Sequence, residues 1–329
     1  MRIGVYSPNW IGDAVMALPF LQQLKLENQR SEIFIICKEW VSGIYENHPA
    51  VTEVIPIRNR DLNGLVSTAR IGFNLRYKKF DRFYTLTDSI RSAFIIWLSG
   101  SKKRYGYRSQ MRSFLLTDVF NLPAAKIHRS NKYLNILGEK NSIDVLPKIH
   151  LSNEEIKWAC NTIITLDLKN PIALLPYSVA TSRSIPNITT KEWIKNSKRD
   201  YLIFGSNSDI TKADELISIC SNNSIKSICG KYSLRQVIAL ISICEYALAA
   251  DSGLGHISAS LDTPTVSFFG AGISKITGPI GSAVLVINKD VHCSPCRKNH
   301  CINIEEPLIC LKSISMSDIE NAVKTLTNQ

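Results

Sequence analysis

The chain has no apolar run long enough to cross a membrane. A membrane-spanning helix needs about 20 consecutive, mainly apolar residues, and no stretch of that kind occurs here. The amino terminus has one basic residue and then a short apolar run at 3–6, without the long apolar centre and small-residue cleavage site of a signal peptide. We therefore expect a cytoplasmic protein.

Internal repeats and low-complexity tracts are also lacking, which argues against solenoid and other repeat architectures. Of the 329 residues, 45% are hydrophobic and 20% are charged, and this balance excludes a mainly disordered chain. One domain usually holds about 100–200 residues, so the length predicts two domains with two cores.

Acidic residues are in short supply. The chain has 39 Lys and Arg against 28 Asp and Glu, a net charge of +11, which calls for an anionic partner: nucleic acid, an acidic membrane surface or a phosphorylated substrate. The stretch 102–112 interleaves Tyr105 and Tyr107 with cations, a pattern that can stack bases and bind phosphates, or that simply forms a solvated face. No recognisable nucleic-acid motif accompanies it, so nucleic acid is a minor alternative.

The nine cysteines argue against a disulfide framework, because the number is odd and the expected compartment is reducing. Five lie singly among apolar residues, as buried small hydrophobes do. The other four cluster near the carboxyl terminus: Cys293, Cys296, Cys301 and Cys310. Four thiolates can enclose a structural zinc or iron with no open position for catalysis. The alternative is free thiols packed in a loop.

Short apolar strands alternate with helical patterns along most of the chain. Strands are expected at 3–6, 31–37, 53–57, 82–86, 172–175, 201–204, 247–250 and 265–268. Helices are expected from 11, near 41–47 and 128–137, and at 89–98, 154–165, 211–220, 234–244, 255–260 and 315–327. Because parallel strands need crossover helices, this alternation predicts doubly wound α/β domains. The polar segment 141–154 is the expected linker between 1–150 and 151–329.

The first candidate site is Trp10-Ile11-Gly12-Asp13, at a strand-to-helix junction. Ligands bind outside the carboxyl edge of a parallel sheet. Gly12 permits close backbone approach there, and Asp13 can act as a general base that deprotonates an acceptor hydroxyl. The alternative is an ordinary helix N-cap.

The second candidate site, residues 251–256, also follows a strand and opens a helix. Free backbone N–H groups and the helix dipole favour a phosphate there, with Ser252 and Gly253 against it. Asp251 or His256 can hold a ribose or sugar. The alternative is a plain cap with a packed histidine.

A third candidate site follows strand 172–175, where Ser178 and then Arg183 can clamp a diphosphate through charge-assisted hydrogen bonds. Ser206 stands in the same relation to strand 201–204. The alternative for both segments is a solvated loop.

Taken together, these motifs resemble the bacterial lipopolysaccharide heptosyltransferases, glycosyltransferase family nine. Residues 10–16 (Trp-Ile-Gly-Asp-Ala-Val-Met) resemble the opening of these proteins, and residues 251–261 are similar to their nucleotide-sugar signature. Residues 105–112 look like a segment of the second heptosyltransferase of the inner core, and Cys293-Ser-Pro-Cys296 occurs in many members. The resemblance runs from residue 1 to about 325.

The resemblance implies a GT-B fold, two Rossmann-like domains facing a central cleft. Residues 1–150 would bind the acceptor and 151–329 the nucleotide-sugar, with a terminal helix able to pack back on the first domain. Members transfer a heptose from ADP-heptose with inversion and without a catalytic cofactor. The acceptor would be the lipid A–Kdo core, which implies a peripheral protein at the cytoplasmic face of the inner membrane.

The resemblance also implies roles for residues, with Asp13 as the general base. The donor-binding set is Ser178, Arg183, Ser206, Asp251, Ser252, Gly253 and His256. The acceptor-binding set is Gly12, Arg104, Arg108 and Arg112. Two alternatives stay open: a family-nine transferase with another nucleotide-sugar or a different acceptor, and a non-catalytic protein that binds nucleic acid or anionic surfaces.

Overall fold

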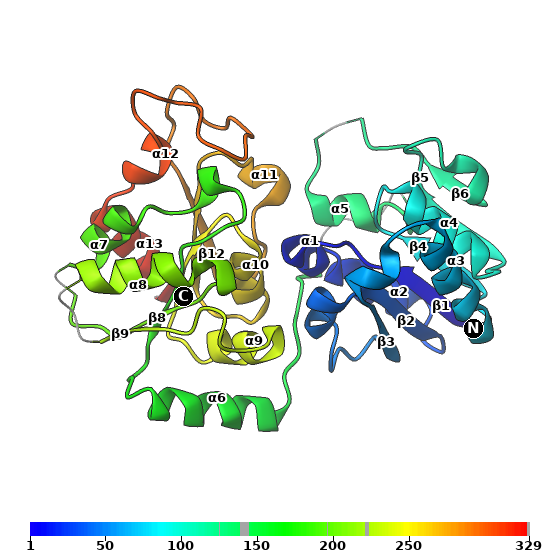
Figure 1. Cartoon of the computed structure of the whole chain (residues 1–329), viewed down its shortest axis with the longest axis horizontal. Helices are drawn as coiled ribbons and strands as arrows, with labels where there is room; N and C mark the ends of the chain where they lie inside the picture. The colour runs from blue at the N-terminus through cyan, green and yellow to red at the C-terminus, as the bar shows by residue number, and fades with distance from the viewer. Residues whose placement is uncertain (125, 139–144, 196, 221–223, 328–329) are drawn as a thin grey trace. The chain divides into compact units, whose positions relative to one another are not determined.

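The computed structural model describes residues 1–124, 126–138, 145–195, 197–220 and 224–327. The chain divides into two compact units, Met1–His150 and Leu151–Gln329 (Figure 1). Each unit contains one parallel sheet of six strands with helices around it. The predicted α/β class is therefore confirmed. Among the described residues, no helix combines the length and apolar character needed to cross a membrane.

The sheet of the first unit has the strand order β3-β2-β1-β4-β5-β6. Its strands are β1 (Arg2–Tyr6), β2 (Glu32–Lys38), β3 (Glu53–Ile57), β4 (Arg82–Thr85), β5 (Lys103–Tyr107) and β6 (Asp118–Phe120). Its α-helices are α1 (Ile11–Met16), α2 (Leu18–Glu27), α3 (Leu65–Asn74), α4 (Ile90–Leu98) and α5 (Arg129–Leu134). Short 3₁₀ turns are η1 (Glu39–Ile44), η2 (Asn59–Leu62), η3 (Leu75–Lys78) and η4 (Ser113–Leu115). The carboxyl ends of all six strands therefore meet at one edge.

The sheet of the second unit has the order β12-β11-β10-β7-β8-β9. Its strands are β7 (Ile172–Leu175), β8 (Tyr201–Ile203), β9 (Ile225–Ser227), β10 (Ala247–Ala250), β11 (Thr265–Phe269) and β12 (Val284–Asn288). Its longer helices are α6 (Asn153–Thr165), α7 (Asn187–Ile194), α8 (Ile210–Ile219), α9 (Leu234–Ser242), α10 (Gly253–Ser260) and α13 (Met316–Thr327). The shorter ones are η5 (Thr181–Arg183), η6 (Asn207–Asp209), α11 (Ser274–Thr277) and α12 (Ile309–Lys312).

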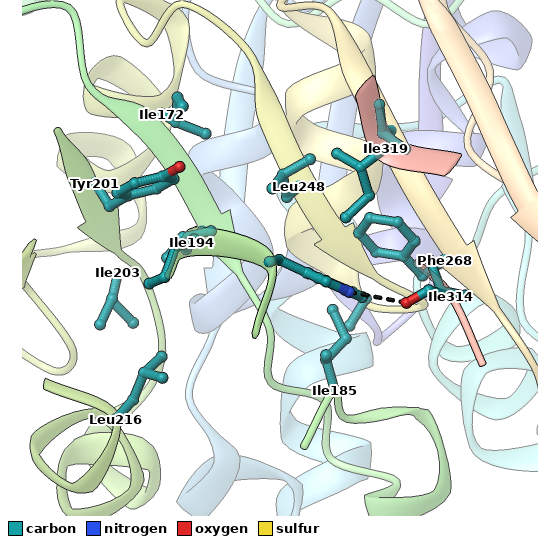
Figure 2. Packing of buried hydrophobic residues seen from close by; sticks show 14 of the residues in the cluster. Ile172, Ile185, Ile194, Tyr201, Ile203, Leu216, Leu248, Phe268, Ile314 and Ile319 are labelled. Carbon is teal, nitrogen blue, oxygen red and sulfur yellow. Dashed lines mark hydrogen bonds between the residues drawn. The ribbon is translucent and has the colours of Figure 1, made fainter. Parts of the chain in front are cut away.

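The core of the second unit lies between its sheet and helices α7, α8 and α13 (Figure 2). The indole Nε1 of Trp193 donates to the carbonyl of Ile314 at 3.0 Å, and its ring centroid lies 4.7 Å from that of Phe268. Helix α13 contributes Ile319 and Leu326 to the same cluster and packs against β11 and β12. The terminal helix thus closes the core of its own unit, where each large apolar side chain stabilises by about 1.5–3 kcal/mol.

Polar side chains begin several helices as their sequences predict. Ser89 accepts from the backbone N–H of Ser92 and caps α4. Ser152 and Glu155 form a reciprocal capping box on α6. Ser315 accepts from the N–H of Asp318 at 3.2 Å, in the first turn of α13. Each such cap is worth about 1 kcal/mol because it satisfies an N–H group that has no partner within the helix.

The tyrosines of the basic stretch 102–112 do not form a base-stacking surface, whereas Lys102, Lys103 and Arg108 are exposed, as the solvated-face alternative expects. Residues 103–107 form β5, which pairs with β4 on one side and β6 on the other. The ring of Tyr105 stacks on Tyr84 with centroids 4.5 Å apart, and Tyr107 is buried. The tyrosines therefore pack within the unit, as aromatic residues on neighbouring strands do.

Candidate active site

Asp13 lies on the first turn of α1, just after the carboxyl end of β1. The N-cap position belongs to Trp10, so the interpretation of Asp13 as an ordinary N-cap is wrong. Its side chain is 20% exposed, and its Oδ1 lies 3.4 Å from Nη1 of Arg129 on α5. Gly12, partly exposed, precedes it on the same turn.

The surroundings of Asp13 combine one cation with buried hydroxyl groups. Burial opposes the charge of Arg129, but Asp13 and Tyr133 raise the Arg129 pKa above its ordinary value. Burial, and then the charge of Asp13, raises the pKa of Tyr133 well above its usual range. The carboxylate of Asp13 therefore lies beside a guanidinium group, and a carboxylate so placed can take a proton from a hydroxyl group. Sequence reasoning missed Arg129 and Tyr133, because they lie far from Asp13 in the chain and carry no motif.

Arg112 does not reach an acceptor, contrary to expectation. Its side chain is fully buried, and its guanidinium donates to the carbonyls of Thr87, Ser89 and Tyr107 at 2.6–3.1 Å. These bonds join the loop after β4 to the end of β5. The sequence shows a cation here, but it does not show that backbone carbonyls accept hydrogen bonds from it.

Of the two other expected acceptor-binding arginines, Arg104 serves the fold and Arg108 is free to contact a ligand. Arg104 is half-buried, and it donates to the carbonyls of Leu115 at 2.8 Å and Ser101 at 2.7 Å. Its role is therefore structural too. Arg108, which follows β5, is exposed and remains a candidate for acceptor binding.

We expect Arg112→Met to destabilise the protein by about 2 kcal/mol, because a buried carbonyl that loses its donor costs about 1–3 kcal/mol. The change in free energy of unfolding, measured by urea denaturation, checks this. Arg108→Met is the matched control, since an exposed site usually changes stability by less than about 0.5 kcal/mol. Equal losses in the two variants would contradict the structural role of Arg112.

In the second unit, Asp251 follows the fully buried strand β10 and precedes α10. Its side chain is 6% exposed, and its Oδ2 lies 3.5 Å from Nε of Arg183 in η5. Burial raises the pKa of Asp251 to about 6, although the charge of Arg183 works in the opposite direction. The structure thus brings together two of the expected donor-binding residues from segments about 70 residues apart.

Three buried polar atoms at this place have no hydrogen-bond partner within the described part of the chain. They are Nε of Arg183, Oδ2 of Asp251 and Oγ of Ser252. Leaving such atoms without partners costs about 1–3 kcal/mol each, so native proteins rarely leave several together. Their position at the N-terminus of α10, where backbone N–H groups are free, suits an anionic ligand that supplies the missing partners.

Neighbouring loops complete this site. The Oγ of Ser178 donates to the carbonyl of Asp251 at 3.1 Å, which ties the loop after β7 to the loop after β10. A Cβ on Gly272, after β11, would lie 2.1 Å from Oδ2 of Asp251. Only glycine therefore lets this third loop approach the carboxylate. Sequence reasoning missed Gly272, although it follows a predicted strand.

The remaining expected donor residues differ in setting. Gly253 is the first residue of α10, and His256 is buried on the same helix. Ser206 follows β8 at the same sheet edge, but its Oγ lies 2.6 Å from Oδ2 of Asp209, in a capping box. The Ser206 hydroxyl therefore caps η6.

The structure does not support the metal expected at the four cysteines. Within the described ranges, no three Cys, His, Asp or Glu side chains are grouped so as to hold a metal ion. All four line one small hollow, but Sγ of Cys301 accepts from the N–H of Leu308 at 3.3 Å. Burial raises the pKa of Cys310, and the nearby thiols of Cys293, Cys301 and Cys296 add to this rise. Cys310 lies on α12, whereas Cys293, Cys296 and Cys301 lie in the loop that precedes it.

Two Rossmann-like units, each a parallel six-stranded sheet with helices, are the architecture of the GT-B class, and the solved structures below share this fold. Residues 68–305 match the family model "Glycosyltransferase family 9 (heptosyltransferase)". The chain therefore belongs to glycosyltransferase family 9, the heptosyltransferases, and the expectations for family, fold and enzyme class are confirmed.

Relatives cover nearly the whole chain. Lipopolysaccharide heptosyltransferase 2 of Escherichia coli K12 is 25% identical over 305 residues, which is 87% of this chain and 88% of that protein. The structure of E. coli ADP-heptose lipopolysaccharide heptosyltransferase II has a TM-score of 0.85 at 23% identity, over 100% of this chain and 99% of that one. E. coli heptosyltransferase WaaC, solved with ADP, has a TM-score of 0.74 at 15% identity, over 99% of each chain.

Proposed function

We propose that the protein transfers a heptose from ADP-heptose to the inner core of lipopolysaccharide, with inversion and with Asp13 as general base. Family membership supports heptosyl transfer, and the matching relative from E. coli acts on lipopolysaccharide by its name. The observation that carries the proposal is the group of three buried polar atoms near the start of α10 that have no hydrogen-bond partner in the described part of the chain; two of them, in Arg183 and Asp251, form an ion pair at 3.5 Å. A nucleotide-sugar diphosphate has the oxygens that two of the three atoms need, and its sugar hydroxyls can donate to Asp251.

The donor lies against the second unit in this proposal. Its diphosphate accepts hydrogen bonds from Arg183, Ser252 and the first N–H groups of α10, which opens with Gly253. Asp251 accepts a bond from a hydroxyl of the sugar or ribose. Binding would also offset the cost of burying the charge of Asp251, because a hydroxyl group that donates to the carboxylate favours its ionised form.

Asp13 acts on the acceptor. As the acceptor oxygen attacks the anomeric carbon, the carboxylate takes the hydroxyl proton, and the bond from that carbon to the ADP oxygen breaks. Attack on the face opposite the leaving ADP inverts the anomeric centre. Negative charge that develops on the leaving diphosphate is stabilised by Arg183 and by the dipole of α10. Arg129, 3.4 Å away, holds the Asp13 carboxylate in place for this step.

The acceptor lies against the first unit, with Gly12 and Arg108 among the residues that contact it. Its chemical identity in this proposal is the lipid A–Kdo core, whose phosphate and carboxylate groups suit an exposed arginine. Because that acceptor is anchored in lipid, we place the protein in the cytoplasm, peripherally at the inner face of the inner membrane.

Ranking nucleotide-sugars by thermal shift tests the donor. We expect ADP-heptose to raise the melting temperature more than ADP-glucose, UDP-sugars or GDP-sugars do. A ligand at about 100 times its Kd stabilises the folded state by about 2.7 kcal/mol. The variant Arg183→Gln should lose most of the shift, whereas Arg199→Gln, at an exposed ion pair in the same unit, should keep it. A larger shift with a UDP-sugar would assign another donor to this family member.

A further inference from the structure

Nearly all of the net positive charge belongs to the first unit. Residues 1–150 contain 22 Lys and Arg and 12 Asp and Glu, a net charge of +10, whereas residues 151–329 contain 17 and 16, a net charge of +1. The proposed donor carries its phosphates to the second unit, so the donor does not explain the surplus. The surplus therefore suits an anionic partner that faces the first unit, such as the lipid-anchored acceptor and the membrane that holds it.

The charge is further concentrated in two segments that lack acidic residues. Residues 62–80 contain four Lys and Arg, residues 89–117 contain six, and neither segment contains Asp or Glu. These segments contain α3 and α4, which pack against each other, together with η3, β5 and η4. The inward-facing Arg104 and Arg112 serve the fold, but Arg70 and Arg91 on the two helices are exposed.

The same segments expose large apolar side chains to an unusual degree. Val66 on α3 is 76% exposed, and Met111 in the loop before η4 is 90% exposed. Leu65 and Phe114 are mostly exposed as well, and Trp97 on α4 is 44% exposed. Apolar residues that project among cations, with no acidic residue between them, are the pattern of surfaces that bind anionic bilayers.

A cavity of about 770 Å³ opens among these residues. Its apolar wall includes Leu65, Trp97 and Phe114, and the cations Lys38 and Arg91 also line it. Burial and the neighbouring charge of Arg91 lower the pKa of Lys38. Over the described ranges, no carboxylate forms an ion pair with either cation, so the pair calls for an anion from outside.

We propose that the α3–α4 face, formed by residues 62–80 and 89–115, docks on an anionic lipid bilayer, and that its cavity holds one anionic lipid. The phosphate of that lipid pairs with Lys38 and Arg91, and an acyl chain lies against Trp97 and Phe114. Val66 and Met111 insert beside it. This inference rests on the proposed function only in that a lipid-anchored acceptor requires work at a membrane.

Vesicle flotation with the full chain tests the docking. We expect at least about tenfold tighter binding to phosphatidylcholine vesicles with about one-third phosphatidylglycerol than to phosphatidylcholine alone, and weakening with salt. The double variant Val66→Glu/Met111→Glu should lose binding about tenfold or more. Its matched control is Ile164→Glu/Ile304→Glu, at two similarly exposed sites of the second unit, which should bind normally.

Vesicles with brominated acyl chains test the cavity, because bromine quenches tryptophan fluorescence at contact. We expect quenching in the unaltered protein and loss of most of it in Trp97→Phe, which retains the exposed Trp10 and Trp40. Undiminished quenching in Trp97→Phe would overturn the lipid in the cavity. Equal binding to both vesicle types, or normal binding by Val66→Glu/Met111→Glu, would overturn the docking face.

Transfer to an acceptor stripped of its acyl chains separates this inference from the proposed function. Val66→Glu/Met111→Glu should transfer to that acceptor at the normal rate, because neither residue is placed in the catalytic or donor site. If the unaltered protein transferred normally but bound no vesicles, the docking face would be overturned and the proposed function would stand. If the unaltered protein bound vesicles but transferred no heptose, the proposed function would be overturned and the docking face would stand.

Discussion

Asp13→Asn should lower kcat/KM for heptosyl transfer by about 10²–10⁴-fold, the range that general-base catalysis contributes. Asparagine has the shape of aspartate and can still accept a hydrogen bond from Arg129, but it cannot take the acceptor proton. The donor site lies in the other unit, so Kd for the donor should change by less than about twofold. Steady-state rates and calorimetric donor binding measure the two quantities.

Asp88→Asn is the matched control for this substitution. Asp88 is a carboxylate of the same unit, 42% exposed, and it pairs with Lys132 at 2.6 Å, as Asp13 pairs with Arg129. Exposed ion pairs of this kind contribute about 0–1 kcal/mol, so its activity should stay near normal. Comparable losses in both variants, or full activity in Asp13→Asn, would remove Asp13 from the role of base.

The sheets could be predicted because buried parallel strands read as continuous apolar runs. Residues 172–175 and 247–250 are buried at every position, and both were assigned from their composition. Helix α3 was missed, since Leu65 and Val66 project outward and obscure the helical pattern. Strand β5 was missed because its first residues are basic and lie partly in solvent.

The candidate site was predictable only in part. Ser178 and Asp251 follow strands that are neighbours in the sheet, so their meeting at its carboxyl edge follows from the topology. The pairing of Asp13 with Arg129 does not, because α5 reaches α1 through tertiary packing alone. The sequence also does not show whether an arginine binds a ligand or the backbone: Arg108 is exposed, whereas Arg112 donates to backbone carbonyls. The roles of such arginines depend on the folded structure.

Asp251→Asn should raise the free energy of unfolding by about 3 kcal/mol at neutral pH, before any donor binds. Burial raises the pKa of Asp251 from 3.8 to about 6, and each unit corresponds to about 1.4 kcal/mol. Because the folded-state pKa is the higher one, the native protein binds the proton more tightly. The penalty is thus absent below pH ~4, grows between pH ~4 and ~6, and is complete above pH ~6. Asparagine, neutral throughout, avoids it.

Denaturant unfolding at several pH values checks this expectation: the stabilisation should be full at pH ~7.5 and nearly vanish at pH ~4. Asp290→Asn, at an exposed carboxylate of the same unit, is the control and should change stability by less than about 0.5 kcal/mol at every pH. If Asp251→Asn lowered the free energy of unfolding, or raised it by the same amount at every pH, the predicted cost of ionising the buried Asp251 would be refuted. If stability rises while donor affinity falls, the charge of Asp251 is kept for binding at the expense of the fold, as is typical of functional sites.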